Sequence, residues 1–314
     1  MENYEKFGHM TDIEPNREAV EYYMPHHGVL RESSSTTKLR VVFNASSHTS
    51  TGISLNKLQM TGAKIQPDLF NIILRFRTKS IVISSDIKMM YRQILINKTD
   101  RKFQKILWRS GPDEPLKTYQ LNTVTYGTTA APFLAVRCLK EIANEVRQDD
   151  LLTVTDSVES AAKFCKNITD YFLKRGFELR KWKSNNPSIL KELNTVDDDN
   201  FIDFSMSDNA ATKTLGLLWL CQSDSLVYKI ATPNLRKNIT KRILLSDIAT
   251  IFDPLGLISP CIILAKVLLQ KLWLERLTWD QPVPDNLAQE CLSLYNEFSE
   301  LQTLKISRQI KCKN

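Results

Sequence analysis

The stretch that decides the fold prediction is residues 81–96, IVISSDIKMMYRQILI. Its first residues, Ile81 to Ile83, are β-branched and predict a buried strand. The strand ends beside an acid, Asp86, and an aromatic residue, Tyr91, follows five positions later. The pattern predicts a strand, a tight turn around residues 88–91 and a second strand over residues 93–96.

The sequence around this stretch predicts an alternation of strands and helices. Residues 26–46 contain two extended runs on either side of the turn-like RESSSTTK, and residues 67–78 place apolar residues at helical spacing behind a proline. The later elements are expected to be a hairpin of residues 102–108 and 117–125, a helix over 129–145, a strand over 151–155, a helix over 158–175 and a strand over 177–182. This order is compatible with an α+β fold built on a ferredoxin-like sheet.

The two ends of the chain are expected to differ from this middle part. Residues 1–25 are polar and favour helix, whereas the acidic segment 194–210 predicts a linker. Residues 214–230 predict a second hairpin. From Lys241 onward the pattern is helical, interrupted by the turn FDPLG.

Composition limits the class of protein. The chain has 314 residues, with a hydrophobic fraction of 42% and a charged fraction of 25%, which is typical of a folded globular protein. The net charge is +7 and the pI is about 9.0. This balance is compatible with a polyanion as partner, and an ordinary basic protein explains it equally well.

The cysteines and histidines argue against a zinc site. The six cysteines form no Cys-x-x-Cys pair, and the four histidines all lie within the first 48 residues. The cysteines indicate free thiols in a reducing compartment, and the polar N-terminus gives no signal peptide. The apolar run 262–274 is interrupted by Lys266, Gln270 and Lys271, so it predicts a buried amphipathic helix and no membrane span. We therefore expect an intracellular protein, in the cytoplasm or the nucleus.

Three acidic residues are candidates for metal binding. Nucleotidyl transfer by two metal ions needs carboxylates that hold both ions, and Mg²⁺ prefers oxygen ligands. Asp86 supplies one carboxylate at a strand end, and Asp149 and Asp150 precede the expected strand 151–155. An Asp-Asp pair on its own is usually a solvated turn.

A second set of residues could contact a nucleotide. The set consists of Lys38, Arg40, Tyr91, Gly127, Lys181 and Lys183. Tyr91 fits either a gate that excludes a 2′-hydroxyl group or a half-buried core aromatic. Lys38 and Arg40 fit contacts to a triphosphate or an ordinary basic strand edge. Gly127 allows close backbone approach or forms a plain turn, and the two later lysines hold phosphate or line a solvated face.

Six blocks of the sequence are longer and more specific than these single residues. They are YYMPHHGVLRESSSTTKLRVVFNASS, SSDIKMMYRQILI, LNTVTYGTTAAPFLAVRCL, GFELRKWKSN, TLGLLWL and IFDPLGLISP with the later WDQPVP. Together they resemble the Pol polyprotein of BEL/Pao-type LTR retrotransposons. The resemblance extends from about Tyr4 to Arg308.

The resemblance implies a right-hand polymerase, a reverse transcriptase that uses two Mg²⁺ ions. Its partners would be an RNA template, a DNA primer and deoxynucleoside triphosphates. The implied roles are catalytic and metal-binding for Asp86, Asp149 and Asp150, a sugar gate for Tyr91, triphosphate contacts in the fingers for Lys38 and Arg40, a nucleotide and template turn for Gly127, and a phosphate-facing palm edge for Lys181.

The resemblance also implies an order of domains. Residues 1–80 would form an N-terminal arm and fingers, residues 81–193 the palm with a fingers insertion at 97–118, residues 194–240 a linker and connecting hairpin, and residues 241–314 a helical thumb-like or connection-like region. The last region resembles a segment described as a Pao peptidase. No Asp-Thr-Gly or Asp-Ser-Gly triplet is present, so protease chemistry is not expected. The ribonuclease H and integrase of the family polyprotein are not expected in this chain either.

Two departures from the family pattern bear on activity. The family has Tyr-Val-Asp-Asp-Leu where this chain has Arg147-Gln148-Asp149-Asp150-Leu151, and about one helix and one strand before this block are missing. Without that strand the paired acids lose the hairpin that aims them, and a displacement of ~1 Å can cost about a hundredfold in rate. A smaller departure is Asn44, where the family often has Asp. We expect a truncated, internally deleted copy with weak or absent polymerase activity.

Two other interpretations stay open on the sequence alone. One is a non-catalytic remnant that binds nucleic acid through its basic residues. The other is a relic without function, because loss of a core strand can exceed the small stability margin of a domain. The oligomeric state has no signal in the sequence.

Overall fold

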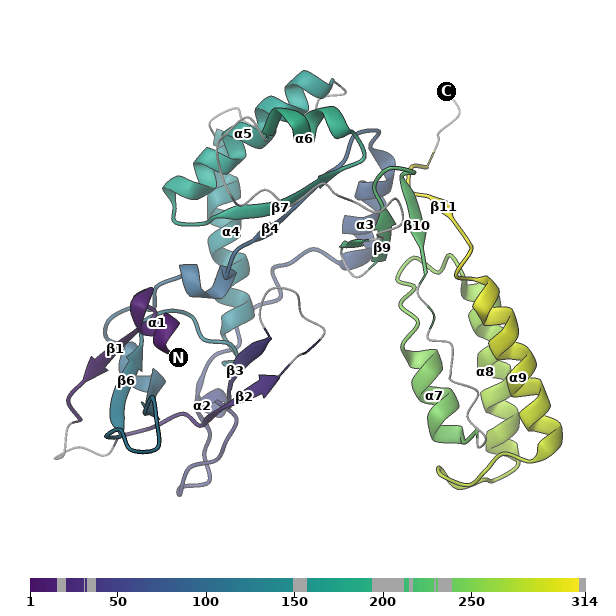
Figure 1. The fold of residues 1–314 in the computed structure, drawn as a ribbon, viewed down its shortest axis with the longest axis horizontal. Coiled ribbons are helices and arrows are strands. Elements are labelled where there is room, and N and C mark those ends of the chain that lie inside the picture. The colour runs from purple at the N-terminus through teal and green to yellow at the C-terminus, as the bar shows by residue number, and fades with distance from the viewer. Residues whose placement is uncertain are drawn as a thin grey trace. The chain divides into compact units, whose positions relative to one another are not determined.

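The protein is described by a computed structural model over residues 1–15, 21–30, 32, 38–148, 157–193, 212–214, 217–228, 230 and 239–310. It divides into two compact units, whose helices and strands are labelled in Figure 1. The first unit consists of residues 1–66, 87–153 and 166–180, and the second consists of residues 67–86, 154–165 and 181–314.

The first unit contains a three-stranded antiparallel sheet. Its strands are β1 (Met10–Ile13), β6 (Lys117–Leu121) and β5 (Lys105–Trp108), in that order across the sheet. The pairing of β5 with β6 confirms the hairpin predicted for residues 102–125. Among the described residues of 1–25, the prediction of helix is correct for α1 (Glu2–Lys6) and wrong for residues 10–13, which form β1. A four-residue strand whose partner lies more than a hundred positions away leaves no readable period in the sequence.

A separate hairpin in the first unit confirms the two extended runs predicted for residues 26–46. β2 (His26–Leu30) pairs antiparallel with β3 (Leu39–Phe43), with Val29 opposite Arg40. Phe43 at the end of β3 is buried in the same cluster as Met10, Ile106 and Leu121. A short helix, α2 (Leu55–Leu58), follows, and the hydroxyl of Ser54 accepts a hydrogen bond from the backbone N–H of Lys57 as its cap.

The deciding stretch forms one strand and not two. β4 (Ile83–Ile87) is paired with β7 (Leu179–Ser184), which confirms the predicted strand at 177–182 with a shift of two residues. The second strand predicted over residues 93–96 is confirmed only in part, because a 3-10 helix, η1 (Met90–Gln93), occupies its start and Leu95 forms a single antiparallel bridge with Thr123. Met89 before it adopts a left-handed φ of 47°, which turns the chain out of the extended conformation.

The predicted helices of the middle part are confirmed. They are α3 (Leu69–Thr78), α4 (Ala131–Gln148) and α5 (Val158–Lys174), and the short α6 (Pro187–Leu193) is an additional helix that was not predicted. Ser157 caps α5 by accepting a hydrogen bond from the N–H of Ser160 at 3.2 Å, and Gly176 at φ 81° follows its end. In the second unit Ala162 and Cys165 of α5 are buried with Ile189 of α6. The strand predicted over 151–155 and the linker 194–210 lie outside the described residues.

The second unit contains a small sheet of the order β11-β10-β9-β8. These strands are β8 (Thr212–Thr214), β9 (Leu217–Leu220), β10 (Ser225–Val227) and β11 (Ile306–Ser307). The antiparallel pair β9–β10 confirms the hairpin predicted at 214–230. Trp219 of β9 is fully buried, and its ring meets that of Phe76 edge to face at 5.1 Å.

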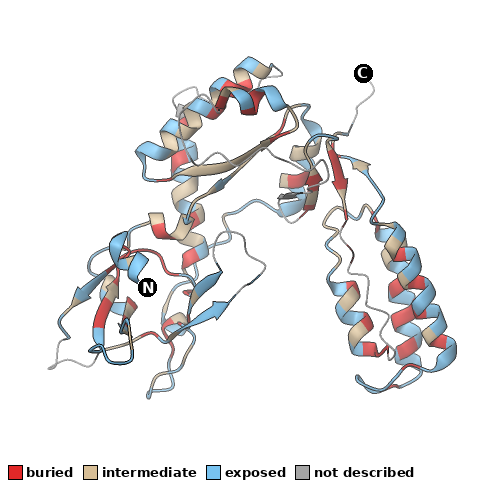
Figure 2. Ribbon diagram, viewed as in Figure 1, coloured by how far each residue is buried: buried red, intermediate tan, exposed pale blue. Residues whose placement is uncertain are grey.

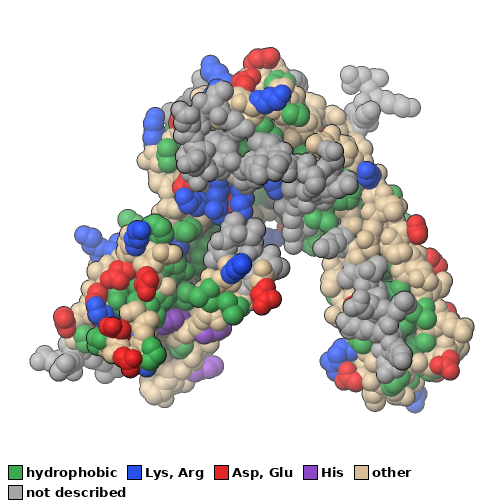
Figure 3. All heavy atoms as spheres, in the orientation of Figure 1, with side chains coloured by type: hydrophobic (Ala, Val, Ile, Leu, Met, Phe, Trp, Pro, Cys, Tyr) green, Lys and Arg blue, Asp and Glu red, His purple; other side chains and the backbone are tan. Residues whose placement is uncertain are grey.

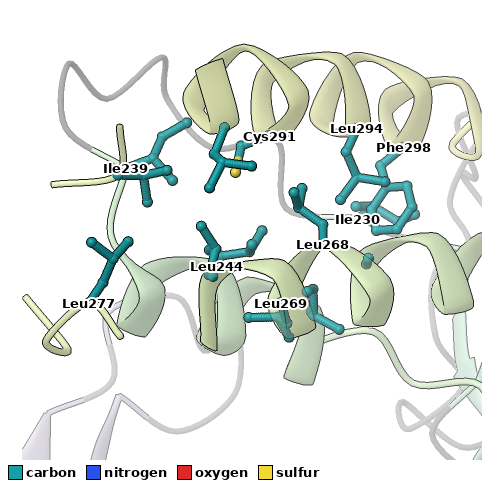
Figure 4. Close-up of a cluster of buried hydrophobic side chains, with 14 of the residues drawn as sticks. Ile230, Ile239, Leu244, Leu268, Leu269, Leu277, Cys291, Leu294 and Phe298 are labelled. Atoms are coloured by element: carbon teal, nitrogen blue, oxygen red, sulfur yellow. The ribbon is translucent and has the colours of Figure 1, made fainter. Parts of the chain in front are cut away.

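The helical pattern predicted from Lys241 is confirmed by three helices. α7 (Lys241–Ala249), α8 (Ser259–Leu274) and α9 (Asp285–Glu300) surround one apolar cluster, in which side chains of all three point toward one another (Figure 4). The predicted FDPLG turn is held by Asp253, whose carboxylate accepts the N–H groups of Leu257 and Ile258, each at 2.9 Å.

Helix α8 has apolar side chains on two sides. One side, with Ala265, Leu268, Leu269 and Leu272, is buried, as predicted for the run 262–274. The other side leaves Ile263, Leu264, Val267 and Leu274 exposed, so burial covers only part of the helix (Figure 2). Within the described residues, no helix has the length and apolar character needed to cross a bilayer.

The buried thiols of the second unit are expected to react slowly. Burial raises the pKa of Cys165 to about 12 and that of Cys291 to about 11, from an ordinary value of 9.0. At pH 8 we expect both to react with a thiol reagent at least about a hundredfold more slowly than in urea-unfolded protein, because the thiolate is the reactive form. Mass spectrometry of the labelled peptides measures this, and equal rates before and after unfolding would show that the thiols are accessible.

Candidate functional site

Tyr91 and Arg40, two of the predicted nucleotide-binding residues, lie near Tyr126 in the first unit. The rings of Tyr91 and Tyr126 are 4.6 Å apart, centroid to centroid, and inclined by 48°. Burial raises the pKa of both tyrosines, while the positive charges of Arg92 and Arg40 act on Tyr126 in the opposite direction. Arg40 is therefore close enough to Tyr126 for its positive charge to act on the pKa of this tyrosine.

The turn at Gly127 is fixed by contacts within the protein. Gly127 has a φ of 95°, and a Cβ atom at this position would lie 2.1 Å from the carbonyl oxygen of Phe43. The Asn56 amide donates to the Gly127 carbonyl at 2.9 Å and accepts from the N–H of Thr129 at 2.8 Å. Glycine is required here by the approach of the β3 backbone, whatever else the turn contacts.

Arg92 is an unpredicted member of this region. It is only 3% exposed, and its guanidinium lies 4.5 Å from the ring centre of Tyr4 and 5.2 Å from that of Phe43. Its Nη1 donates to the hydroxyls of Thr123 and Thr125 at 3.3 and 3.4 Å. Burial lowers its pKa. No sequence signal marks this arginine, because its aromatic neighbours come from three distant segments.

Asp86 belongs to the second unit and stands at the exposed end of β4. Its charge acts on Lys183 of β7, which is half-buried. Burial is the main cause that lowers the pKa of Lys183; Cys221 and Asp86 act to raise it, and Lys181 acts to lower it further. The structure therefore brings Asp86, Lys181 and Lys183 into one electrostatic neighbourhood.

The two faces of this strand pair differ in character. Ile83 of β4 and Trp182 of β7 pack into the cluster formed by α5 and α6. Because side chains alternate along a strand, the neighbouring residues Asp86 and Lys183 belong to the opposite side. Lys181 has a φ of 57°, an unusual conformation for a residue other than glycine. One face is thus covered by helices and the other carries charge.

The remaining predicted residues have no described contact with the residues around Tyr91 or with those around Asp86. Lys38 is exposed ahead of β3. Asp149 and Asp150 lie outside the described residues, so the predicted carboxylate triad has one described member. Among the described residues, no group of three or more His, Cys, Asp or Glu side chains is arranged to hold a metal ion. Of the three predicted ligands, Asp86 is the one with a described position, and its exposed carboxylate is a type of ligand that Mg²⁺ prefers.

The segment that leads into Asp149 is helical. α4 continues through Gln148, the last described residue before the acidic pair. Helix, in place of the strand of the family pattern, therefore leads up to Asp149.

Comparison with protein families gives a match in the C-terminal part. The family model described as "Pao retrotransposon-like RNaseH-like domain" matches residues 240–314, which include α7, α8, α9 and β11. The match supports the Pao-type retrotransposon part of the resemblance and does not extend to residues 1–239. Its description corrects the expectation that no ribonuclease-H-like part would be found in the chain. A search of curated proteins gives no match.

Proposed function

We propose that this chain is a reverse-transcriptase-derived fragment of a Pao-type retrotransposon Pol polyprotein whose polymerase activity is impaired. The family match at residues 240–314 supports the retrotransposon origin, and the sequence blocks before it support the polymerase ancestry. The observation that carries the impairment is the course of α4, which is helical through Gln148. Residues in a helix cannot supply the strand that would orient Asp149 and Asp150 toward a metal pair.

Nucleic-acid binding follows from the distribution of charge. Residues 67–193 contain 22 Lys and Arg against 14 Asp and Glu, a net charge of +8, which exceeds the +7 of the whole chain. In Figure 3, Lys and Arg side chains gather where Figure 1 draws β4 and β7. A concentrated positive charge of this size favours a polyanion. The proposed partners are an RNA template and a DNA primer, and the ribonuclease-H-like description of the C-terminal match agrees with nucleic acid in general.

The residues in the first unit provide the proposed nucleotide contacts. Tyr91 would stand beside the sugar, Arg40 with Lys38 would meet the triphosphate, and Gly127 would keep its turn narrow. Asp86, with Asp149 and Asp150, would hold Mg²⁺, and Lys181 would lie at the phosphate-facing edge. When bound, two Mg²⁺ ions stabilise the attacking and leaving oxygens of an in-line displacement.

A non-catalytic nucleic-acid-binding protein is the second candidate. The observation that favours it is the retention of the positive charge in residues 67–193 beside an acidic set of which only Asp86 has a described position. Both candidates predict nucleic-acid binding without efficient synthesis, and extension of a primer in Mg²⁺ that Asp86→Ala abolishes would exclude this second one. A relic without function is the third possibility, and a cooperative thermal transition of the purified protein would count against it.

Binding to a primer–template is expected to depend steeply on salt. Fluorescence anisotropy between 50 and 200 mM salt should give a slope of log affinity against log salt steeper than about −3, because each phosphate contact releases counterions. Lys181→Glu should weaken binding by about three- to tenfold and flatten the slope. The matched control is Lys305→Glu, an exposed lysine outside residues 67–193, which should change little.

Asp86→Ala separates binding from catalysis. It removes a negative charge from the basic segment, so primer–template affinity should stay equal or rise slightly. Salt-insensitive binding, or equal losses in Lys181→Glu and Lys305→Glu, would contradict the assignment of the interface to residues 67–193.

A further inference from the structure

The first unit contains a cavity that the proposed function does not use. It has a volume of about 400 Å³ and lies between α2, residues 96–104 and the start of α4. Leu55, Val124 and Leu134 contribute to its apolar wall, and Leu58 and Phe103 are 72% and 47% exposed beside it. The volume falls within the range of ligand pockets, roughly 300–1,000 Å³. None of the predicted site residues lines it.

The polar groups that line this cavity have one property in common, because each presents a hydrogen-bond acceptor. Within the described residues, the enclosed Gln59 Oε1 accepts no hydrogen bond. The Gln104 amide nitrogen donates to the carbonyls of Leu121 and Thr123, at 3.5 and 3.4 Å, which leaves its oxygen as the remaining group. The Thr128 hydroxyl donates to the carbonyl of Thr125 at 2.8 Å, so only its lone pairs remain.

The charged side chain that lines the cavity is acidic. Asp100 is exposed, and within the described residues its carboxylate accepts a long hydrogen bond, 3.4 Å, from the Thr99 hydroxyl. The two cations that follow it in the chain do not line the cavity. Arg101 donates to the Ile96 carbonyl at 2.9 Å, and the Lys102 ammonium lies 5.2 Å from the Phe103 ring centre. A carboxylate and hydrogen-bond acceptors beside an apolar wall favour a ligand that donates.

We infer that this cavity binds a hydrophobic organic amine in its protonated form. The apolar body lies against Leu55, Val124 and Leu134, and the ammonium group pairs with the exposed carboxylate of Asp100. An anionic ligand of the same shape would meet this like charge, so the site favours a cationic head group. The inference is independent of the proposed polymerase ancestry, because it uses none of those residues.

A pair of ligands with the same ring system tests this assignment on the full chain. The probes are 2-(1-naphthyl)ethylamine and 1-naphthylacetic acid, titrated at pH 7 and followed by NMR or calorimetry. The amine should bind with a Kd on the order of 1 mM or below, as expected for a ligand of this size, and the acid at least about tenfold more weakly. Equal affinity of the two probes, or no binding of the amine up to about 5 mM, would overturn the inference.

Two matched variants then locate the head group. Asp100→Asn should weaken binding of the amine by about tenfold and leave that of the acid equal or improved. Asp113→Asn removes the same charge from an exposed position that does not line the cavity and should leave both affinities unchanged. Equal effects of the two variants would place the amine elsewhere. Since Asp100 is exposed, both proteins should keep the thermal transition of the parent, and the two-probe comparison stands without them.

Discussion

Replacing Arg308 by leucine is expected to lower the free energy of unfolding of the second unit by about 3–5 kcal/mol. Arg308 is fully buried and forms a two-point ion pair with Asp224, with N–O distances of 2.6 and 2.7 Å. Loss of the guanidinium would leave the Asp224 carboxylate partly buried without its counter-charge. A broken buried pair costs far more than its net contribution, because the remaining charge stays desolvated.

The same guanidinium also binds backbone carbonyl groups at the C-terminal end of α3. It donates to the carbonyls of Phe76, Lys79 at 2.8 Å and Ser80 at 3.1 Å, at and just beyond the C-terminus of α3. These groups have no partner within the helix, and a positive charge is favourable there. Arg308 therefore joins the C-terminal segment, the β9–β10 turn and α3, and its removal affects all three.

Urea unfolding followed by tryptophan fluorescence measures this effect. Trp219 is fully buried and donates through Nε1 to Asp224 at 3.0 Å, so its emission reports on the region directly. The matched control is Arg242→Leu, because Arg242 forms an equivalent two-point pair with Asp280 on the surface. Solvent screens that exposed pair, so its loss should change stability little. Equal shifts of the midpoint in the two variants would show that burial of the Arg308 pair is not decisive.

The second large effect is expected for Gly127→Ala, which should destabilise the first unit by about 2–4 kcal/mol. The new methyl group would lie 2.1 Å from the Phe43 carbonyl oxygen, and the neighbouring atom is backbone that cannot rotate away. The φ of 95° adds the ordinary cost of a left-handed conformation for alanine. The turn and the end of β3 must separate to relieve the contact.

Gly52→Ala is the control for Gly127→Ala. Gly52 also has a positive φ, 74°, but an added Cβ meets no atom within 4 Å. It should therefore cost only the conformational term, about 1 kcal/mol. Urea unfolding monitored by circular dichroism compares the two variants. Similar losses would mean that the close approach of Phe43 is unimportant and that φ alone explains the glycine.

The parts of the fold that the sequence predicts are those decided by neighbouring residues. The hairpins β2–β3, β5–β6 and β9–β10 carry an alternating pattern on both sides of a short turn, so each can be identified locally. Helices α5 and α7 are likewise marked by a capping residue and a helical spacing of apolar residues. In these cases local preference and tertiary structure agree.

The errors arise where the partner is distant along the chain. The sequence suggests residues 93–96 as the partner of β4, because they are the nearest extended segment. The observed partner is β7, about ninety residues later, which no local pattern reveals. The same holds for β1, which pairs with β6, and for β11, which pairs with β10. Helix α8 shows a related limit, since its apolar residues do not indicate which side is covered.

The candidate site divides in the same way. Asp86 and Tyr91 could be singled out because a strand exit, an acid and an aromatic lie within a few residues. The contact of Gly127 with Phe43, the aromatic surroundings of Arg92 and the pair Asp224–Arg308 join residues more than thirty positions apart. No local pattern predicts such contacts, because the side chains acquire their partners only when the chain folds.

The most direct test of the proposed ancestry and of its loss of activity is a single-turnover experiment with protein in excess over an RNA template carrying a DNA primer, in Mg²⁺ and all four deoxynucleoside triphosphates. The fractions of primer bound and primer extended are measured in the same samples, for the natural sequence and for Asp86→Ala. We predict that both proteins bind the primer–template to a similar extent and that neither extends it above the other. Extension that disappears in Asp86→Ala would contradict the proposed impairment, and failure of either protein to bind would contradict the nucleic-acid function itself.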